Sequence, residues 1–271
     1  AIANPEPLAR ALARPTQIYL GLFGWLIWVF DKAAEVLLKL LRIEPVHDVD
    51  STASAEDLDR IALDSRASGS LPAEVSVLID RVLDDLPCDS VAVDNEGGAR
   101  EAVEHLIANG HRRIALIHDD ARIVTARDRQ AGYVKALQAH GLPVDQRLIA
   151  VSSSTVQHAI EATIRLFSQA ERPTALFTVD SVMTTGALLA LRSIGLTIPR
   201  DVSLIGFDDF DLATFTDPQI TVVAQPVGKI GPVAVKMLLE RIRGLSEPPR
   251  HVRFQTRLIC RGSVSRIFRP A

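Results

Sequence analysis

The sequence is poor in cysteine and has no surplus of basic residues. Its 271 residues include two cysteines, Cys88 and Cys260, which lie far apart and outside any CxxC spacing. This pattern predicts two packed thiols in a reducing compartment, and it argues against a disulfide framework or a zinc site. The net charge is −3, and no Lys/Arg-rich tail is present. Because phosphate neutralisation needs clustered cations, nucleic-acid binding by these residues is not indicated.

Signatures of catalysis are missing as well. The chain has no GxSxG elbow, Walker loop, GxGxxG or HExxH motif,. The acidic stretch 48–64 lacks the glycine and spacing of a calcium loop, so we interpret it as a solvated face,. Asp208 and Asp209 are neighbours in sequence, and their side chains are expected to diverge rather than flank a glycosidic bond. We therefore expect no enzyme activity, no cofactor and no metal site.

No apolar run is long enough to cross a bilayer. Residues 17–30 carry no charge and contain both tryptophans, Trp25 and Trp28, but this run of about 14 falls short of the roughly 20 residues that span a membrane,. No secretory signal is evident. Residues 1–45 read as an apolar or amphipathic helical segment, and 17–43 suits a helix lying at a membrane interface. The alternative is a helix hairpin that packs on a soluble core.

Residues 46–85 are interpreted as a linker followed by helices. Ser54 to Asp57 could cap a helix that runs to Arg66,. The stretch 72–86 is ambiguous. Its apolar residues fit a helical period, which we favour, but Val75, Val77 and Ile79 also alternate as a strand would.

From residue 90 onward the chain repeats one pattern, in which a short apolar run ends in polar residues and a helix-patterned segment follows. Strands alternating with helices imply a parallel sheet. The expected strands are 90–93, 113–118, 147–151, 174–178, 202–207, 220–224 and 252–259. The expected helices are 95–108 (with Asn95 as its cap), 123–140, 155–170, 181–194 and 227–243.

Polar residues stand where several of these strands end or helices begin. Arg127 lies at the entrance of a helix, and Asp180 and Asp208 lie just past strand ends. In a parallel sheet the carboxyl ends of the strands share one rim, where ligands bind. An arginine beside carboxylates suits a neutral polyol, because sugar hydroxyls both donate and accept hydrogen bonds. The plainer alternative is that Arg127 and Asp208 form an ion pair that closes the rim.

Several motifs in register resemble the sensor half of the lactose-repressor (LacI/GalR) family of bacterial transcription regulators. The resemblance covers residues 86–266. It is carried by 91–95 (VAVDN), 105–116 (HLIANGHRRIAL), 126–133 (ARDRQAGY), 201–209 (DVSLIGFDD), 218–226 (PQITVVAQP) and 256–259 (TRLI).

The resemblance implies a type I periplasmic-binding-protein-like fold of the α/β class, with a doubly wound parallel sheet and an effector in the cleft between two lobes. It places Arg127 and Asp208 at effector-contacting positions, and Phe207 where a ring can stack on a sugar. Asp180 falls in the family's Asn-Asp pair, but Val179 replaces the asparagine, which puts the usual sugar class in doubt. Arg127→Ala is expected to abolish binding.

The resemblance also implies that one lobe is intact and the other partial. The intact lobe is expected to comprise residues 95–208 and 250–266, and the partial lobe 86–93 and 218–245. No stretch of 1–85 resembles the family's helix-turn-helix, so DNA binding is expected of the family and not of this chain. Weak effector binding is expected, because half of one cleft wall is missing.

Residues 1–84 resemble a different family, the end of the transmembrane domain of CorC/hemolysin-C-type membrane proteins. The resemblance is carried by 4–15 (NPEPLARALARP), 37–45 (LLKLLRIEP) and 54–58 (SAEDL). The sequence therefore looks like a fusion of two fragments, in which an α-helical N-terminal segment precedes the sensor domain.

Three functions remain open at this point. The first is a truncated LacI/GalR-type effector sensor that binds a sugar or similar small polar ligand, is cytoplasmic and forms a homodimer through 227–243 and the intact lobe. The second is a sugar-binding protein of a transporter, which shares the fold but needs export. The third is a membrane-associated fusion fragment without ligand activity.

Overall fold

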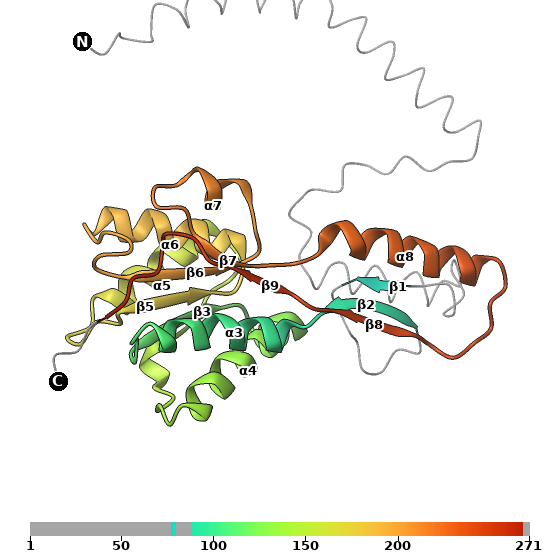
Figure 1. Ribbon diagram of the computed structural model, residues 1–271, viewed down its shortest axis with the longest axis horizontal. Coiled ribbons are helices and arrows are strands. Elements are labelled where there is room, and N and C mark those ends of the chain that lie inside the picture. The colour runs from blue at the N-terminus through green and yellow to red at the C-terminus, as the bar shows by residue number, and fades with distance from the viewer. Residues whose placement is uncertain (1–76, 80–87, 268–271) are drawn as a thin grey trace, which may run out of the picture. The chain divides into compact units, whose positions relative to one another are not determined.

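The computed structural model describes residues 77–79 and 88–267, and these form two parallel-dominated sheets with their helices. The larger sheet has the strand order β4-β3-β5-β6-β7-β9, and the smaller has the order β1-β2-β8. We call the six-stranded sheet with its helices the large lobe, and the three-stranded sheet with helix α8 the small lobe (Figure 1). The expected α/β class with a doubly wound parallel sheet is confirmed.

The large lobe is built on strands that are buried on both faces. Strands β3 (Ile114–His118), β5 (Ala175–Thr178) and β6 (Ser203–Phe207) are buried throughout, as short apolar runs in parallel sheets should be,. β4 (Ile149–Val151) follows a short 3-10 turn, η1 (Gln146–Leu148), at one edge. β7 (Thr221–Ala224) pairs parallel with β6, and β9 (Arg257–Ile259) closes the other edge antiparallel to β7.

Helices cover both faces of the large sheet. On one face lie α3 (Asn95–Ala108) and α4 (Val124–Ala139), and on the other lie α5 (Val156–Phe167) and α6 (Ser181–Ser193) (Figure 1). A short helix, α7 (Asp211–Phe215), follows β6.

The close packing of α3 on α4 depends on a glycine. A Cβ atom at Gly132 of α4 would overlap the carbonyl oxygen of Glu96 and the methyl group of Ala99 in α3. Glycine lets the two backbones approach each other, and this fixes α4 against the start of α3.

The small lobe packs one long helix on a short sheet. β2 (Asp89–Val93) lies between β1 (Val77–Ile79) and β8 (His251–Phe254), and all pairs are parallel. Helix α8 (Val227–Ile242) contributes Ile230, Ala234 and Met237 to a small apolar core with β2.

Three expectations from the sequence are corrected. The helix favoured for 72–86 is wrong at 77–79, which pair with β2 as a strand. The single final strand 252–259 is two strands in different sheets, because the chain leaves the small sheet after Phe254 and joins the large one at Arg257. Helix α3 is capped by Asp94, whose carboxylate accepts from Gly97 N at 2.9 Å, and not by Asn95.

The two lobes also divide the chain differently from the expected boundaries. Residues 221–224 were assigned to the partial lobe, but β7 lies between β6 and β9 in the large sheet. Residues 251–254 were assigned to the intact lobe, but β8 pairs with β2 in the small sheet. Hydrogen-bond pairing decides both cases. The expected segment 1–45, and all of the expected segment 46–85 except 77–79, lie outside the described residues, and so does the helix to Arg66.

Candidate functional site

The candidate site lies where β3, β5 and β6 end side by side in the large sheet. β5 pairs in parallel with both β3 and β6, so the residues that follow these strands share one edge. Asp119 follows β3, Asp180 follows β5 and Asp208 follows β6. Helices α4 and α6 begin on the same edge. The parallel topology thus brings together two predicted residues, Asp180 and Asp208, as expected for this fold.

Arg127 does not take part in this cluster. Its side chain is 54% exposed and lies 3.8 Å from the carboxylate of its neighbour Asp128. The alternative in which Arg127 pairs with Asp208 is also wrong, because Asp208 accepts instead from Gln225, whose Nε2 lies 2.6 Å from Asp208 Oδ1. The arginine that enters the site is Arg129, two residues further along α4.

Arg129 is buried, with 6% exposure, and its guanidinium is held from several sides. Nε donates to Asn95 Oδ1 at 2.8 Å, and one terminal nitrogen donates to the carbonyl oxygen of Val179 at 2.5 Å. The guanidinium carbon lies 3.8 Å from the centre of the Phe207 ring, which is a cation–π contact,. A buried cation must be paired and hydrogen-bonded to be tolerated, and these contacts fix its position.

Phe207 serves this arginine and does not offer a free face to a ligand. The residue is fully buried, and the guanidinium of Arg129 covers one face of its ring. The expectation that Phe207 stacks directly on a sugar is therefore corrected. Val179, at the position where the related family has asparagine, contributes its backbone carbonyl to Arg129.

Asp180 has a structural role and a chemical one. As the N-cap of α6, its Oδ1 accepts from Met183 N at 2.6 Å, which satisfies a helix-terminal donor,. Its Oδ2 accepts from the Ser154 hydroxyl at 2.9 Å. Burial raises the pKa of Asp180 above its ordinary value, and the nearby Asp208 carboxylate adds to this rise. Arg129 and the hydrogen bonds oppose the rise without cancelling it.

Asp208 is held in an unusual backbone conformation. Its φ of 77° places it in the left-handed region, where non-glycine residues are uncommon,. Its amide donates to the Val223 carbonyl at 2.9 Å, and its side chain is fixed by Gln225. Backbone strain of this kind costs about 1–3 kcal/mol and clusters at functional sites. The turn directs Asp208 onto the same edge as Asp180.

Four residues of the cluster were not predicted as site residues from the sequence: Asn95, Asp119, Arg129 and Ser154. Ser154 joins two carboxylates, since its hydroxyl lies 2.6 Å from Asp119 Oδ2 and 2.9 Å from Asp180 Oδ2. A usable signal existed for Arg129. It stands four residues before the apolar Tyr133, so both share the buried face of α4, whereas Arg127 faces outward,.

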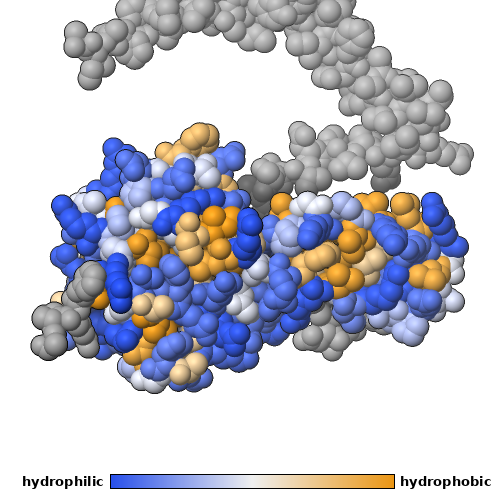
Figure 2. Space-filling model, in the orientation of Figure 1, coloured by the Kyte–Doolittle hydropathy of each residue, from blue (hydrophilic) through white to orange (hydrophobic). Residues whose placement is uncertain are grey.

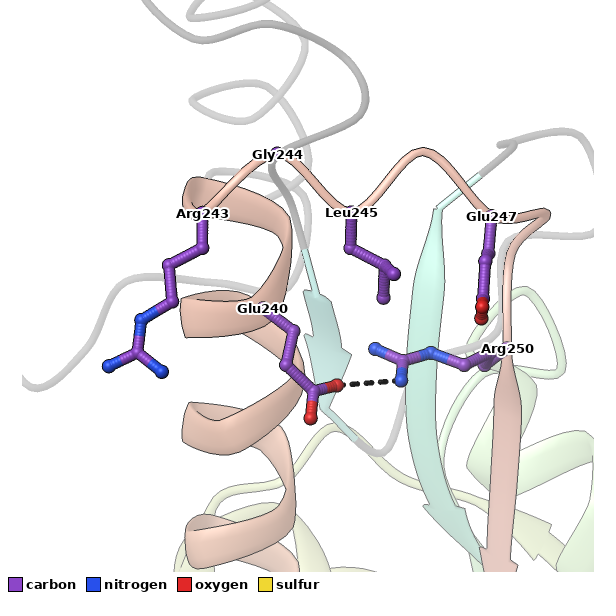
Figure 3. A pocket seen from close by; sticks show the side chains of 6 residues that line it. All are labelled: Glu240, Arg243, Gly244, Leu245, Glu247 and Arg250. Carbon is purple, nitrogen blue, oxygen red and sulfur yellow. Dashed lines mark hydrogen bonds and ion pairs between the residues drawn. The ribbon is translucent and has the colours of Figure 1, made fainter.

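A hollow in the described surface lies elsewhere, at the end of α8. Figure 3 shows Glu240 and Arg250 pointing toward each other, and their ion pair measures 2.7 Å. Arg243 points away from this pair (Figure 3). The lining residues are Glu240, Arg243, Gly244, Leu245, Glu247 and Arg250. The hollow lies on the small lobe and shares no residue with the cluster formed by Asp119, Asp180, Asp208 and Arg129.

The described residues contain neither a cluster of metal ligands nor a membrane-spanning helix. Among residues 77–79 and 88–267, no group of three or more His, Cys, Asp or Glu side chains is arranged to hold a metal ion. In the same part of the chain, no helix has the length and apolar character needed to cross a membrane.

The sequence of the site-bearing region matches a family model. Residues 103–264 match the periplasmic binding protein-like domain. The chain belongs to this family. A separate model, the cyclin M transmembrane N-terminal domain, matches residues 1–75. The two matched ranges do not overlap, as the resemblance of 1–84 to a second family had predicted.

Relatives of this periplasmic binding protein-like chain include bacterial transcription regulators. It is 33% identical to the HTH-type transcriptional regulator GalS of Salmonella typhimurium over 189 residues, which is 70% of this chain and 56% of GalS. It is 35% identical to the repressor CytR of Escherichia coli over 187 residues, 69% of this chain and 55% of CytR. The chain thus spans little more than half the length of these regulators.

Solved structures of the family share the fold. A complex of the transcriptional regulator CelR with cellobiose has a TM-score of 0.68 at 29% identity, covering 78% of this chain and 71% of CelR. A LacI-family regulator from Enterococcus faecium with bound ribose has a TM-score of 0.69 at 25% identity, covering 80% of this chain and 78% of the regulator. The expected sensor fold is confirmed.

Proposed function

We propose that the large lobe carries the effector site of a LacI/GalR-type transcription regulator and that it binds a small polar ligand of the sugar class. The observation that carries this proposal is the fixed guanidinium of Arg129 beside Asp180 and Asp208 at the carboxyl ends of β5 and β6. Burying such a charge is unfavourable unless it is paired, and contacts with Asn95, a backbone carbonyl and Phe207 stabilise it here,. Relatives solved with cellobiose and with ribose support the ligand class.

In such a sensor the ligand acts by shifting an equilibrium between conformations. A ligand that binds one arrangement of the lobes better than another favours that arrangement by its difference in affinity. The rim groups suit this role because a fixed fork of donors and two carboxylates discriminates among arrangements of hydroxyls. Transcription control and DNA binding are functions of whole LacI/GalR-type regulators, and we do not expect DNA binding from this chain. We propose that the chain is cytoplasmic, as such a sensor would be.

The test is calorimetric titration with a panel of hexoses, pentoses and disaccharides. The unmodified 271-residue chain is compared with its Arg129→Gln and Arg127→Gln variants. Both substitutions remove one guanidinium from α4. We expect Arg129→Gln to weaken binding by about tenfold or more, because it removes charge-assisted hydrogen bonds of about 1.5–3 kcal/mol. Arg127→Gln should leave affinity within about twofold, since its side chain is exposed,.

Circular dichroism controls for folding of both variants. Equal losses in the two variants, or a loss confined to Arg127→Gln, would place the site elsewhere. If no sugar of the panel binds the unmodified chain, the effector proposal itself is wrong.

We also propose that the chain forms a homodimer and that the outer face of α8 contributes to it. Val235, Leu239 and Ile242 of α8 are 56%, 43% and 60% exposed, and apolar surface is visible over this helix in Figure 2. Exposed apolar patches mark interaction sites. Sedimentation velocity should show a dimer that Val235→Lys with Ile242→Lys converts to monomer. A wild-type monomer at micromolar concentration contradicts the proposal.

We further propose that residues 1–75 derive from a membrane protein and that the chain joins fragments of two families. The separate match of 1–75 to a transmembrane-domain model supports this, as does the interface-type composition of 17–43. Flotation with anionic vesicles compares the whole chain with one lacking residues 1–45. Equal binding of both chains would argue against membrane-surface association. A transcript crossing codons 75–103 tests whether the join is natural.

A further inference from the structure

The rim of the large lobe holds more negative than positive charge. Other acidic residues nearby have a guanidinium partner: Asp120 pairs with Arg122 at 3.0 Å, and Asp209 pairs with Arg261 at 2.8 Å. In the described part of the chain, no Lys or Arg forms an ion pair with Asp119, Asp180 or Asp208. The charge of Arg129 lowers the pKa of Asp180, but this effect is smaller than that of burial.

A histidine beside these carboxylates does not supply the missing positive charge. His118, the last residue of β3, is 2% exposed, and neither of its ring nitrogens has a hydrogen-bond partner in the described part of the structure. Burial lowers the pKa of His118, while Asp119 and Asp120 act in the opposite direction. The net effect lowers the pKa of His118, which disfavours its charged form. The edge therefore gains no positive charge from this ring.

A serine lies between two of the carboxylates. Ser154 Oγ lies within hydrogen-bonding distance of both Asp119 Oδ2 and Asp180 Oδ2. A hydroxyl has one proton and donates one hydrogen bond. It therefore serves only one of these two Oδ2 atoms at a time. The other oxygen of each carboxylate accepts from a backbone amide, Asp119 Oδ1 from Asp120 N and Asp180 Oδ1 from Met183 N. A ligand that brings several donors and a positive charge would complete this arrangement.

We infer that the effector is a small cation of the amino-sugar type, whose protonated amine lies beside Ser154 between Asp119 and Asp180 while Asp208 and Arg129 take its hydroxyls. The inference rests on the proposed effector function of this rim. An ammonium group donates three hydrogen bonds and accepts none, which matches an edge made of acceptors. Because burial desolvates Asp180, the attraction of a cation to its carboxylate is less screened than at an open surface,. A neutral sugar can donate hydrogen bonds from its hydroxyls, but it leaves the negative charge of the two carboxylates uncompensated.

The test uses matched ligands that differ at one position. The 271-residue chain is titrated at pH 7 with D-glucosamine, D-glucose and N-acetyl-D-glucosamine, and with the same three forms of galactose. We expect at least one amine form to bind about tenfold or more tightly than its two neutral forms, the difference of one charged hydrogen bond. Asp119→Asn should remove most of this preference. Asp120→Asn, which alters the adjacent carboxylate that Arg122 already pairs, should keep it.

Each outcome decides between the two proposals. Neutral sugars that bind as tightly as the amines overturn the cationic ligand and leave the effector function standing. Equal losses for Asp119→Asn and Asp120→Asn also overturn it, because a general field effect would then account for the preference. Binding of none of the six sugars removes the support for both. Thermal unfolding of each variant checks that Asp119→Asn retains the wild-type midpoint.

Discussion

The large lobe and the small lobe reach stability by different means. The large lobe has a continuous apolar core in which Leu116, Phe177 and Leu204 are fully buried, and helices pack on both sheet faces. The small lobe has a core of Val91, Val93 and three α8 side chains. Apolar burial scales with area, so the large lobe has far more of the dominant stabilising term.

The small lobe instead holds its elements together with buried charge. Asp89 of β2 has a fully buried side chain and pairs with Arg241 of α8 at 2.6 Å and with Arg250, just before β8, at 3.0 Å. Arg250 also forms an ion pair with Glu240 of α8 at 2.7 Å. This cluster links helix and sheet where the apolar core is thin. The comparison teaches that a rich core leaves the rim of the large lobe free to carry strained and buried polar groups.

The sharpest way to break this comparison is Asp89→Ala. Removing one partner from a buried ion pair costs about 3–5 kcal/mol, because Arg241 is left buried and uncompensated. We expect hydrogen exchange to accelerate in β2, β8 and α8 while β3, β5 and β6 stay protected. The control is Glu104→Ala, which breaks an exposed pair with Arg100 and should change stability by less than about 1 kcal/mol,. Equal acceleration in both lobes would show that they unfold as one.

Acid should act on the same cluster with a smaller effect. Burial opposes ionisation of Asp89, but hydrogen bonds from Arg241 and Arg250 outweigh it and hold its pKa well below the usual range. Its stabilisation is therefore fully present above the ordinary aspartate pKa of about 4 and is lost as pH falls below it. We expect the small lobe to lose exchange protection in this acid range before the large lobe does. The loss is smaller than for Asp89→Ala, because a neutral carboxyl still accepts hydrogen bonds. A large lobe that melts first contradicts this prediction.

Two glycine substitutions should change stability in opposite directions. Gly132→Ala forces a methyl group into the α3 backbone, an overpacking that costs about 1–3 kcal/mol,. Gly228→Ala in the first turn of α8 meets no atom within 4 Å, so the chain should gain about 0.4–1 kcal/mol from the lower conformational entropy of its unfolded state,. Chemical denaturation measures both. Destabilisation by Gly228→Ala would indicate that the exposed face of α8 is covered in solution, as the dimer proposal requires.

Much of the fold could be predicted from local sequence patterns. Short apolar runs gave the buried strands at 114–118, 175–178 and 203–207, each within about a residue. The stretch 72–86 misled because its apolar residues fit both periods, and only pairing with β2 decided for a strand at 77–79. The stretch 252–259 misled because alternation continues across a change of sheet, and periodicity does not say which partner a strand finds.

The candidate site was predicted in part. Asp180 and Asp208 follow strand ends, and parallel pairing places such residues on one edge. Arg127 was expected from its position along the chain, but it lies on the exposed face of α4, and Arg129 is the arginine buried at the site. Asp119 and Ser154 follow β3 and β4, whose order in the sheet brings them beside Asp180. Sequence order alone does not reveal that neighbourhood.

The sequence by itself determined the fold class and the strand ends at which a ligand site would form, because periodicity and turn residues act locally. Its motifs carried the resemblance to the family. The tertiary structure decided which arginine is buried, which carboxylates share a hydroxyl and which lobe each late strand joins. These outcomes depend on contacts between residues distant in sequence, such as Arg129 with Val179 and Asp89 with Arg241. Burial and pairing in three dimensions set their energies, and so they set the charge of the rim.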